Sequence, residues 1–183
     1  GPTPPSLGSG GAIAFSLRRN GNVDIYALNQ ASRQLVRLTH HEADDRSPAW
    51  SPDGDYLAFA SNRADNWDVY LLDLASGALI RLTHHAGFDG NPSWSPDGRW
   101  LAFESYREGN LDIFVMETGG GDLHAVTTDP AADFAPAWAH EGQALAFTSL
   151  RDGSRDIFIR TLEGDSQVVN VTQRVKTKIL DHN

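Results

Sequence analysis

The chain has 183 residues, a length typical of one domain that can build its own core. It contains no cysteine, which excludes disulfides and thiolate metal sites. Its formal net charge of −9 argues against nucleic acid and anionic membranes as partners, and favours cations and basic surfaces. Since no run of about 18 apolar residues occurs, we expect no direct insertion into a membrane.

The first eleven residues, GPTPPSLGSGG, are rich in Pro, Gly and Ser and contain no initiator Met. This composition is typical of a flexible linker or a remnant of cloning, and it does not fit a signal peptide. We therefore expect residues 1–11 to lie outside the fold, and the chain to be a piece of a longer protein.

A ten-residue phrase organises the rest of the chain. SPAWSPDGDY at 47–56 returns as NPSWSPDGRW at 91–100 and, less closely, as APAWAHEGQA at 135–144, which gives a period of 44 residues. Repetition of this kind is the first guide to the architecture. It divides the region 12–173 into units at 13–56, 57–100, 101–144 and 145–173, followed by a tail at 174–183.

Each unit contains four short stretches typical of β-strands. In the second unit they are LAFAS (57–61), DVYLLDL (68–74), ALIRLT (78–83) and PSWS (92–95). Apolar runs of this length without a helical period favour strands. Four strands in about 40 to 45 residues are typical of one propeller blade. We therefore predict an all-β fold, a β-propeller of four-stranded antiparallel blades with about four repeats.

The segment Ser51-Pro52-Asp53-Gly54 carries a hydroxyl and a carboxylate, but its composition is that of a tight turn. Pro fixes its own φ, Asp can bond the backbone, and Gly accepts a positive φ at the exit. The third unit keeps Gly142 but has Ala-His-Glu before it, a change that a turn tolerates and a catalytic pair does not. We interpret the segment as a hairpin turn.

The recurring strings PxWSPDG, LAFxS, R..N.D[IV][YF] and LT resemble the TolB-like propeller repeat, a distant relative of WD repeats. The resemblance covers residues 13–172. It implies blades of four strands, usually six to eight per ring, and an extracytoplasmic location, because TolB itself is a periplasmic protein that binds other proteins. Similar propellers also gate peptidases, but no hydrolase domain accompanies the repeats here.

Four units raise the question of how the ring closes. A small closed ring, a ring shared with a second chain, and a fragment of a larger ring all fit the sequence. The tail after Thr172, QRVKTKIL, alternates polar and apolar residues and could supply the inner strand that the first unit lacks. Unpaired edges invite association, so a homo-oligomer formed through open blade edges is an alternative.

Polar and aromatic residues recur in columns at the repeat period. We expect the aromatic columns to pack between blades, and each Arg to hold the loop before the Asp five residues later. The aromatic columns are Trp50, Trp94 and Trp138, and Phe15, Phe59, Phe103 and Phe147. The charged columns are Arg19, Arg63, Arg107 and Arg151, and Asp24, Asp68, Asp112 and Asp156.

Residues that vary between units are better functional candidates. Imidazole and carboxylate groups could hold a divalent cation such as Ca²⁺, and the weak metal candidates are His40, His41, His84, His85 and Asp89. The alternatives are an exposed acidic rim and a partner-binding surface. We assign the surface to Asp45, His84, His85, Asp89 and Asp133, and expect substitution of His84 or Asp89 to affect folding little.

Sequence strings typical of hydrolases, metalloproteases, EF-hands and phosphate-binding loops do not occur, and no cofactor is predicted. We therefore expect no enzymatic activity. The first functional hypothesis is a non-catalytic extracytoplasmic recognition or scaffolding module whose loop face binds a protein or peptide, basic or extended in character. The alternative is an accessory ligand-binding, polysaccharide-binding or sensor domain of a larger enzyme or receptor.

Overall fold

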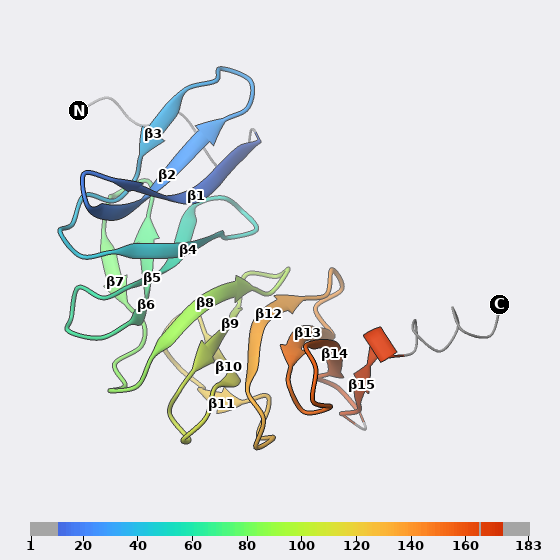
Figure 1. Ribbon diagram of the computed structural model, residues 1–183. Helices are drawn as coiled ribbons and strands as arrows, with labels where there is room; N and C mark the ends of the chain where they lie inside the picture. The colour runs from blue at the N-terminus through green and yellow to red at the C-terminus, as the bar shows by residue number, and fades with distance from the viewer. Residues whose placement is uncertain (1–10, 165, 174–183) are drawn as a thin grey trace, which may run out of the picture.

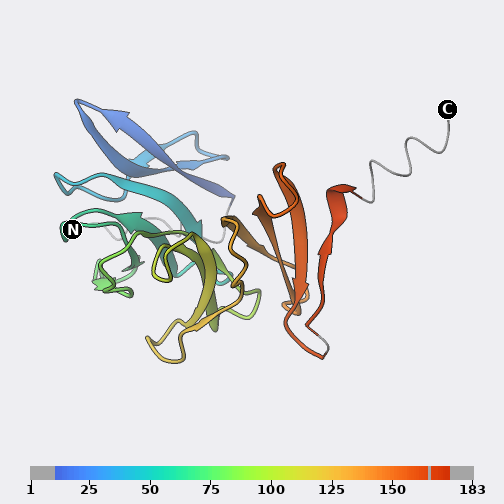
Figure 2. The same cartoon turned by 60° about the horizontal axis from the view of Figure 1, so that its bottom comes forward.

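The computed structural model describes residues 11–164 and 166–173, which form four antiparallel β-sheets arranged as an arc of propeller blades (Figure 1). This confirms the predicted all-β architecture. Figure 2 shows blade 1, in blue, and blade 4, in orange to red, at opposite ends of the arc. Residues 1–10 of the linker predicted at 1–11, and the closing strand predicted at 174–183, lie outside the described residues.

The strands follow one another in chain order within each sheet. Blade 1 comprises β1 (Ala12–Arg19), β2 (Asn22–Asn29) and β3 (Leu35–Arg37). Blade 2 comprises β4 (Asp45–Trp50), β5 (Tyr56–Ser61), β6 (Asp68–Asp73) and β7 (Leu79–Arg81). Blade 3 comprises β8 (Asp89–Trp94), β9 (Trp100–Ser105), β10 (Asp112–Glu117) and β11 (His124–Ala125). Blade 4 comprises β12 (Asp133–Trp138), β13 (Ala144–Ser149), β14 (Asp156–Thr161) and β15 (Val168–Asn170).

The first strands of blades 2, 3 and 4 are neighbours: β4 contacts β8, and β8 contacts β12. Each bends at a β-bulge before its proline, where Ser47, Asn91 and Ala135 have positive φ angles of 53°, 48° and 54°. Blade 1 has three strands, and among the described residues no strand pairs with β1 on the side away from β2, where the inner strand of the other blades lies.

The core lies between blades, as the aromatic columns predicted. Phe59 and Phe103 have no exposed surface, and Phe147 is 1% exposed. Phe103 belongs to a cluster that also contains residues of blade 2, with Trp94 packed against it. The indole N–H groups of Trp94 and Trp138 donate to the carbonyls of Ala49 and Ser93 on the preceding blade, both at 3.0 Å. Trp94 and Trp138 therefore join neighbouring blades by packing and by a hydrogen bond.

The Ser-Pro-Asp-Gly segment is a hairpin turn, as predicted. The Ser51 hydroxyl donates to Asp53 Oδ1 at 2.5 Å, and the Tyr56 amide donates to Ser51 Oγ at 2.9 Å. Gly54 has a φ of 78°. In blade 4 the turn keeps the same backbone bond, from the Gly142 amide to the Ala139 carbonyl, without the side-chain contacts. The hydroxyl and the carboxylate are therefore parts of a turn.

The connections fall into two groups at the two ends of the blades. We call the end that carries the β5–β6 and β7–β8 connections, 62–67 and 82–88, and their equivalents in the other blades, the loop face. The opposite end, which carries the Ser-Pro-Asp-Gly turns, is the turn face. His40, His41, His84 and His85 are exposed on the loop face.

We predict that the free edge of β1 is covered in solution, either by the tail at 174–183 or by a second copy of the chain, because an unpaired edge exposes a row of backbone groups. Light scattering on the chain and on a version ending at Gln173 separates the two routes. A chain that is monomeric and stays soluble and monomeric after truncation would contradict this prediction.

The turns predict a pH dependence of stability. Hydrogen bonds from the Ser51 hydroxyl and the Asp55 amide lower the pKa of Asp53 below its ordinary value, and Ser95 and the Arg99 amide do the same for the pKa of Asp97. A lowered folded-state pKa stabilises the fold above the unfolded value of about 3.9 and ceases to do so as the pH falls through the folded-state pKa.

The stability difference between the wild type and the Ser51→Ala/Ser95→Ala variant should therefore be larger at about pH 6 than at about pH 3. Urea unfolding at several pH values measures it, with the wild type compared at each pH so that other titrating groups cancel. A difference that does not change with pH would show that these carboxylates do not titrate as described.

We further predict that packing residues and loop residues differ in their effect on stability. Trp94→Ala should lower the free energy of unfolding by about 3 to 5 kcal/mol, since it removes a large packed ring. His84→Ala should change it by less than about 0.5 kcal/mol, since His84 is exposed. Chemical denaturation of both variants measures this. The reverse order would mean that the two faces are assigned wrongly.

Candidate functional site

Three predicted partner-binding carboxylates are buried, which corrects the expectation of an exposed acidic rim. Asp45, Asp89 and Asp133 have no exposed surface. Each is the first residue of an inner strand, and its side chain points into the blade to accept hydrogen bonds from an arginine at 2.8 to 3.0 Å. The arginines are Arg63, Arg107 and Arg151. Substituting Asp89 would leave the largely buried guanidinium of Arg107 unpaired, so the structure leads us to expect that the substitution destabilises the fold.

The arginine column therefore has a different partner from the one expected. Arg63 binds Asp45, which lies 18 residues before it, and not Asp68. Its Nε donates to Ser61 Oγ at 2.8 Å. Its guanidinium lies 5.5 Å from the ring centre of Phe59 and 4.9 Å from that of Tyr70. A guanidinium between a carboxylate and two rings is a structural element of the blade.

The second aspartate column has its own arginines. Arg37 binds Asp24 and Arg81 binds Asp68, with nitrogen–oxygen distances of 2.7 Å in both. These arginines lie on β3 and β7, at the outer side of the blades. Both aspartates are almost wholly buried, so this column is also scaffold in the first two blades.

The second histidine of each pair shapes a turn on the loop face. His41 Nδ1 accepts from the Ala43 amide and His85 Nδ1 accepts from the Gly87 amide, both at 3.0 Å. In blade 3 the carboxylate of Asp129 accepts from the Ala131 amide in the same place, at 2.9 Å. An imidazole and a carboxylate are interchangeable here because both are hydrogen-bond acceptors.

The predicted metal candidates on the loop face do not form a metal site in the described part of the chain. Within residues 11–164 and 166–173, no group of three or more His, Asp or Glu side chains is placed to hold a metal ion. Asp89 is buried and bound to Arg107, whereas the imidazoles are exposed. The predicted candidates His40, His41, His84, His85 and Asp89 are thus not brought together.

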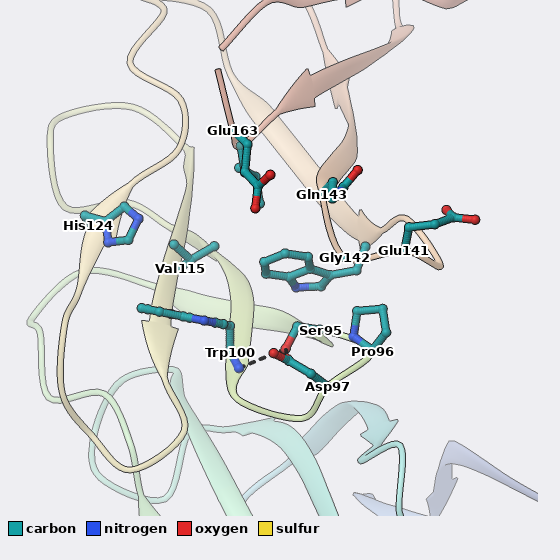
Figure 3. A pocket seen from close by; sticks show the side chains of 12 residues that line it. Ser95, Pro96, Asp97, Trp100, Val115, His124, Glu141, Gly142, Gln143 and Glu163 are labelled. Carbon is teal, nitrogen blue, oxygen red and sulfur yellow. Dashed lines mark hydrogen bonds between the residues drawn. The ribbon is translucent and has the colours of Figure 1, made fainter. Parts of the chain in front are cut away.

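A pocket of about 470 Å³ lies on the turn face between blades 3 and 4. Figure 3 shows Trp100, Val115 and His124 on the blade 3 side, and Gln143, Glu141 and Glu163 on the blade 4 side. Trp138 and Leu162 add apolar surface, while Asp97 adds a further carboxylate. The pocket offers apolar walls with an acidic rim, which suits a ligand with an apolar body and polar or cationic groups.

A buried network that sequence reasoning missed crosses three blades. Glu104 is 4% exposed and accepts from Asn91 Nδ2 at 2.7 Å and from the Ala135 amide at 2.6 Å. Asn91 in turn accepts from the Ser47 hydroxyl at 2.5 Å. Comparison of the repeats could have revealed this residue, because Glu104 is acidic where the other units have Ser16, Ala60 and Thr148.

Solved structures of similar fold come from several bacteria. TolB from Acinetobacter baumannii superposes with a TM-score of 0.81 at 28% identity, over 88% of this chain and 41% of its own. A protein described as TolB from Agrobacterium tumefaciens gives 0.78 at 26%, over 86% and 59%. Oligogalacturonate lyase from Vibrio parahaemolyticus gives 0.67 at 17%, over 87% and 48%, a likeness of fold alone.

The chain thus spans about two fifths to three fifths of these TolB structures. No relative is found among the curated proteins. No helix among the described residues is long and apolar enough to cross a membrane. The family model of the TolB beta propeller domain matches residues 4–84 and 46–173. Because these matches cover most of the sequence, the chain belongs to the TolB β-propeller family.

Proposed function

We propose that this chain is a non-catalytic, extracytoplasmic recognition module that binds a protein or peptide through its loop face. The observation that supports the proposal is that the repeated polar residues form structural contacts within the blades and turns. In blades 2 and 3, Arg63, Arg81 and Arg107 are bonded to the buried Asp45, Asp68 and Asp89, and the Ser-Pro-Asp-Gly residues form turns. The exposed residues that differ between the repeats lie on loops, and loops on a rigid scaffold often carry the function of a protein.

The extracytoplasmic location is proposed from membership of the TolB family. The character of the partner follows from charge. A net charge of −9 attracts basic partners over a distance, and the attraction decreases when salt shortens the screening length to about 8 Å. The predicted contacts His84 and His85 remain available on the loop face, while Asp45, Asp89 and Asp133 would act indirectly, by fixing the inner strands.

A second candidate function is the binding of a small ligand or saccharide within a larger enzyme or receptor. The pocket between blades 3 and 4 favours it, because the rings of Trp100 and Trp138 offer flat apolar surface beside Gln143 and carboxylates. Weak sugar binding that is lost in Trp100→Ala and unchanged in loop-face variants would support this alternative.

We predict that partner capture depends on the loop face and on salt. The chain is immobilised, exposed to an envelope extract, and compared with a His84→Ser/His85→Ser variant and with a Glu141→Gln/Glu163→Gln control on the turn face. We expect the loop-face variant to lose most of the binding of a captured protein, the control to keep it, and binding to weaken between about 50 and 300 mM salt.

Two outcomes would overturn the proposal. One is a partner that both variants capture as well as the wild type. The other is reproducible turnover of a peptide or glycan by the purified chain, which would show that the loop face or the pocket supports catalysis.

A further inference from the structure

The arginines of the outer strands in blades 1 and 2 occupy equivalent sites. Arg81 Nη2 donates to Asp68 Oδ2 at 2.7 Å, and its Nε donates to the Thr83 carbonyl at 3.0 Å. Arg37 does the same with Asp24 and the Thr39 carbonyl, at 2.7 and 2.9 Å. One carboxylate and one carbonyl thus receive two N–H groups of each guanidinium.

Blade 3 keeps the site and lacks the arginine. One period after Arg81 the residue is Ala125, on β11, while Asp112 and Thr127 are retained. Thr127 Oγ1 accepts from the Ile113 amide at 2.9 Å and donates to Asp112 Oδ1 at 3.1 Å, as Thr83 Oγ1 does with the Val69 amide and Asp68. The side chain changes from Arg to Ala, but the surrounding hydrogen bonds do not.

An open hollow of about 500 Å³ lies beside Ala125. Its walls include Asp112, Asn110, Glu108 and Asp129, on the loop face. Asp112 is only 2% exposed, and no cation is paired with its carboxylate in the part of the chain that the structure describes. A buried carboxylate without a counter-charge is costly, so the hollow favours a cation.

The charge around the hollow has also changed. Where blade 3 has Glu108 and Asp129, blade 2 has Ala64 and His85. Burial raises the pKa of Asp112 above its ordinary value, the Thr127 hydroxyl opposes that, and the charges of Asp133, Asp129 and Glu108 add to it. The Arg81–Asp68 pair of blade 2 is thus replaced in blade 3 by Asp112 without an arginine, and Glu108 and Asp129 line the same hollow.

The arginine beside Asp129 is already bound elsewhere. Arg151 Nη2 is bound to Asp133 at 2.8 Å, and its Nη1 lies 3.8 Å from Asp129. It therefore acts as the blade 4 member of the buried Arg column, whose equivalents in blades 2 and 3 bind Asp45 and Asp89.

We propose that the hollow beside Ala125 binds the guanidinium group of an arginine side chain of the partner, in the position that Arg37 and Arg81 occupy in blades 1 and 2. This inference rests on the proposed recognition function and names the group recognised. A guanidinium can give one N–H to Asp112 and another to the carbonyl of Thr127, whereas an ammonium has no planar pair of donors.

Small probes test the site without the unknown partner. The full chain is titrated with N-acetyl-arginine methylamide and with the corresponding lysine compound, and binding is followed by backbone NMR shifts at Ala125 and Thr127. We expect saturable binding of the arginine probe, and at least about tenfold weaker binding of the lysine probe.

Three variants separate the site from general charge. Asp112→Asn keeps an acceptor for Thr127 and should weaken arginine binding by at least about tenfold. Ala125→Arg should fill the hollow with its own guanidinium, abolish probe binding and raise the melting temperature. Ala78→Arg, the same change at an exposed position on the turn face, is the matched control and should leave binding unchanged.

The proposal is overturned if the arginine probe does not saturate, if the lysine probe binds equally well, or if Ala125→Arg binds the probe as the wild type does. Binding of Ca²⁺ that Asp112→Asn abolishes, with no arginine binding, would overturn it too. A partner that is captured through the loop face but is indifferent to Asp112→Asn would sustain the recognition function and reject the arginine site. If no partner is captured but the arginine probe still binds, the arginine site is sustained and the recognition function is rejected.

Discussion

The fold depends on one repeated interaction, a largely buried arginine held between an inner-strand aspartate and two aromatic rings. Arg63 joins the first residue of β4 to the end of β5 and covers Phe59 and Tyr70 of the middle strands. Neither charge could be buried alone, since an unpaired buried ion is strongly destabilising. The Arg63–Asp45 pair therefore fixes where β4 begins and where the loop after β5 starts. These two points define the shape of the loop face in this blade.

This dependence explains which parts of the molecule were predictable from the sequence. The turn at Ser51–Gly54, the strand alternation and the interblade position of Trp94 follow from local chemistry and from the period. The partner of Arg63 could not be predicted, because Asp45 and Asp68 both recur at the repeat period and the choice between them depends on strand register. Asp89 was expected to be exposed because it precedes the predicted strand PSWS (92–95), whereas β8 begins at Asp89, three residues before Pro92, and the carboxylate is buried.

Departures from the repeat carry the functional information, since what every blade shares is needed by every blade. Glu104 stands where other units have small residues, and it ties β9 to the inner strands of blades 3 and 4 through Asn91 and Ala135. Ala125 stands where two units have arginine, and it leaves Asp112 without a cation. Both departures lie in blade 3 and both involve a buried carboxylate, but one is satisfied within the chain and the other calls for a group from outside.

The distribution of exposed charge indicates where a basic partner would bind. Aspartates in buried pairs add nothing to the field at long range, so the net charge of −9 that a partner meets comes from carboxylates outside those pairs. The hollow of blade 1 is lined by Arg19 and Arg37, whereas the hollow of blade 3 is lined by Glu108 and Asp129. A basic partner is therefore attracted to the loop face of blade 3. There, an arginine that reaches Asp112 would exchange its hydration for a charged pair of the kind that Arg37 and Arg81 already form in the same chain.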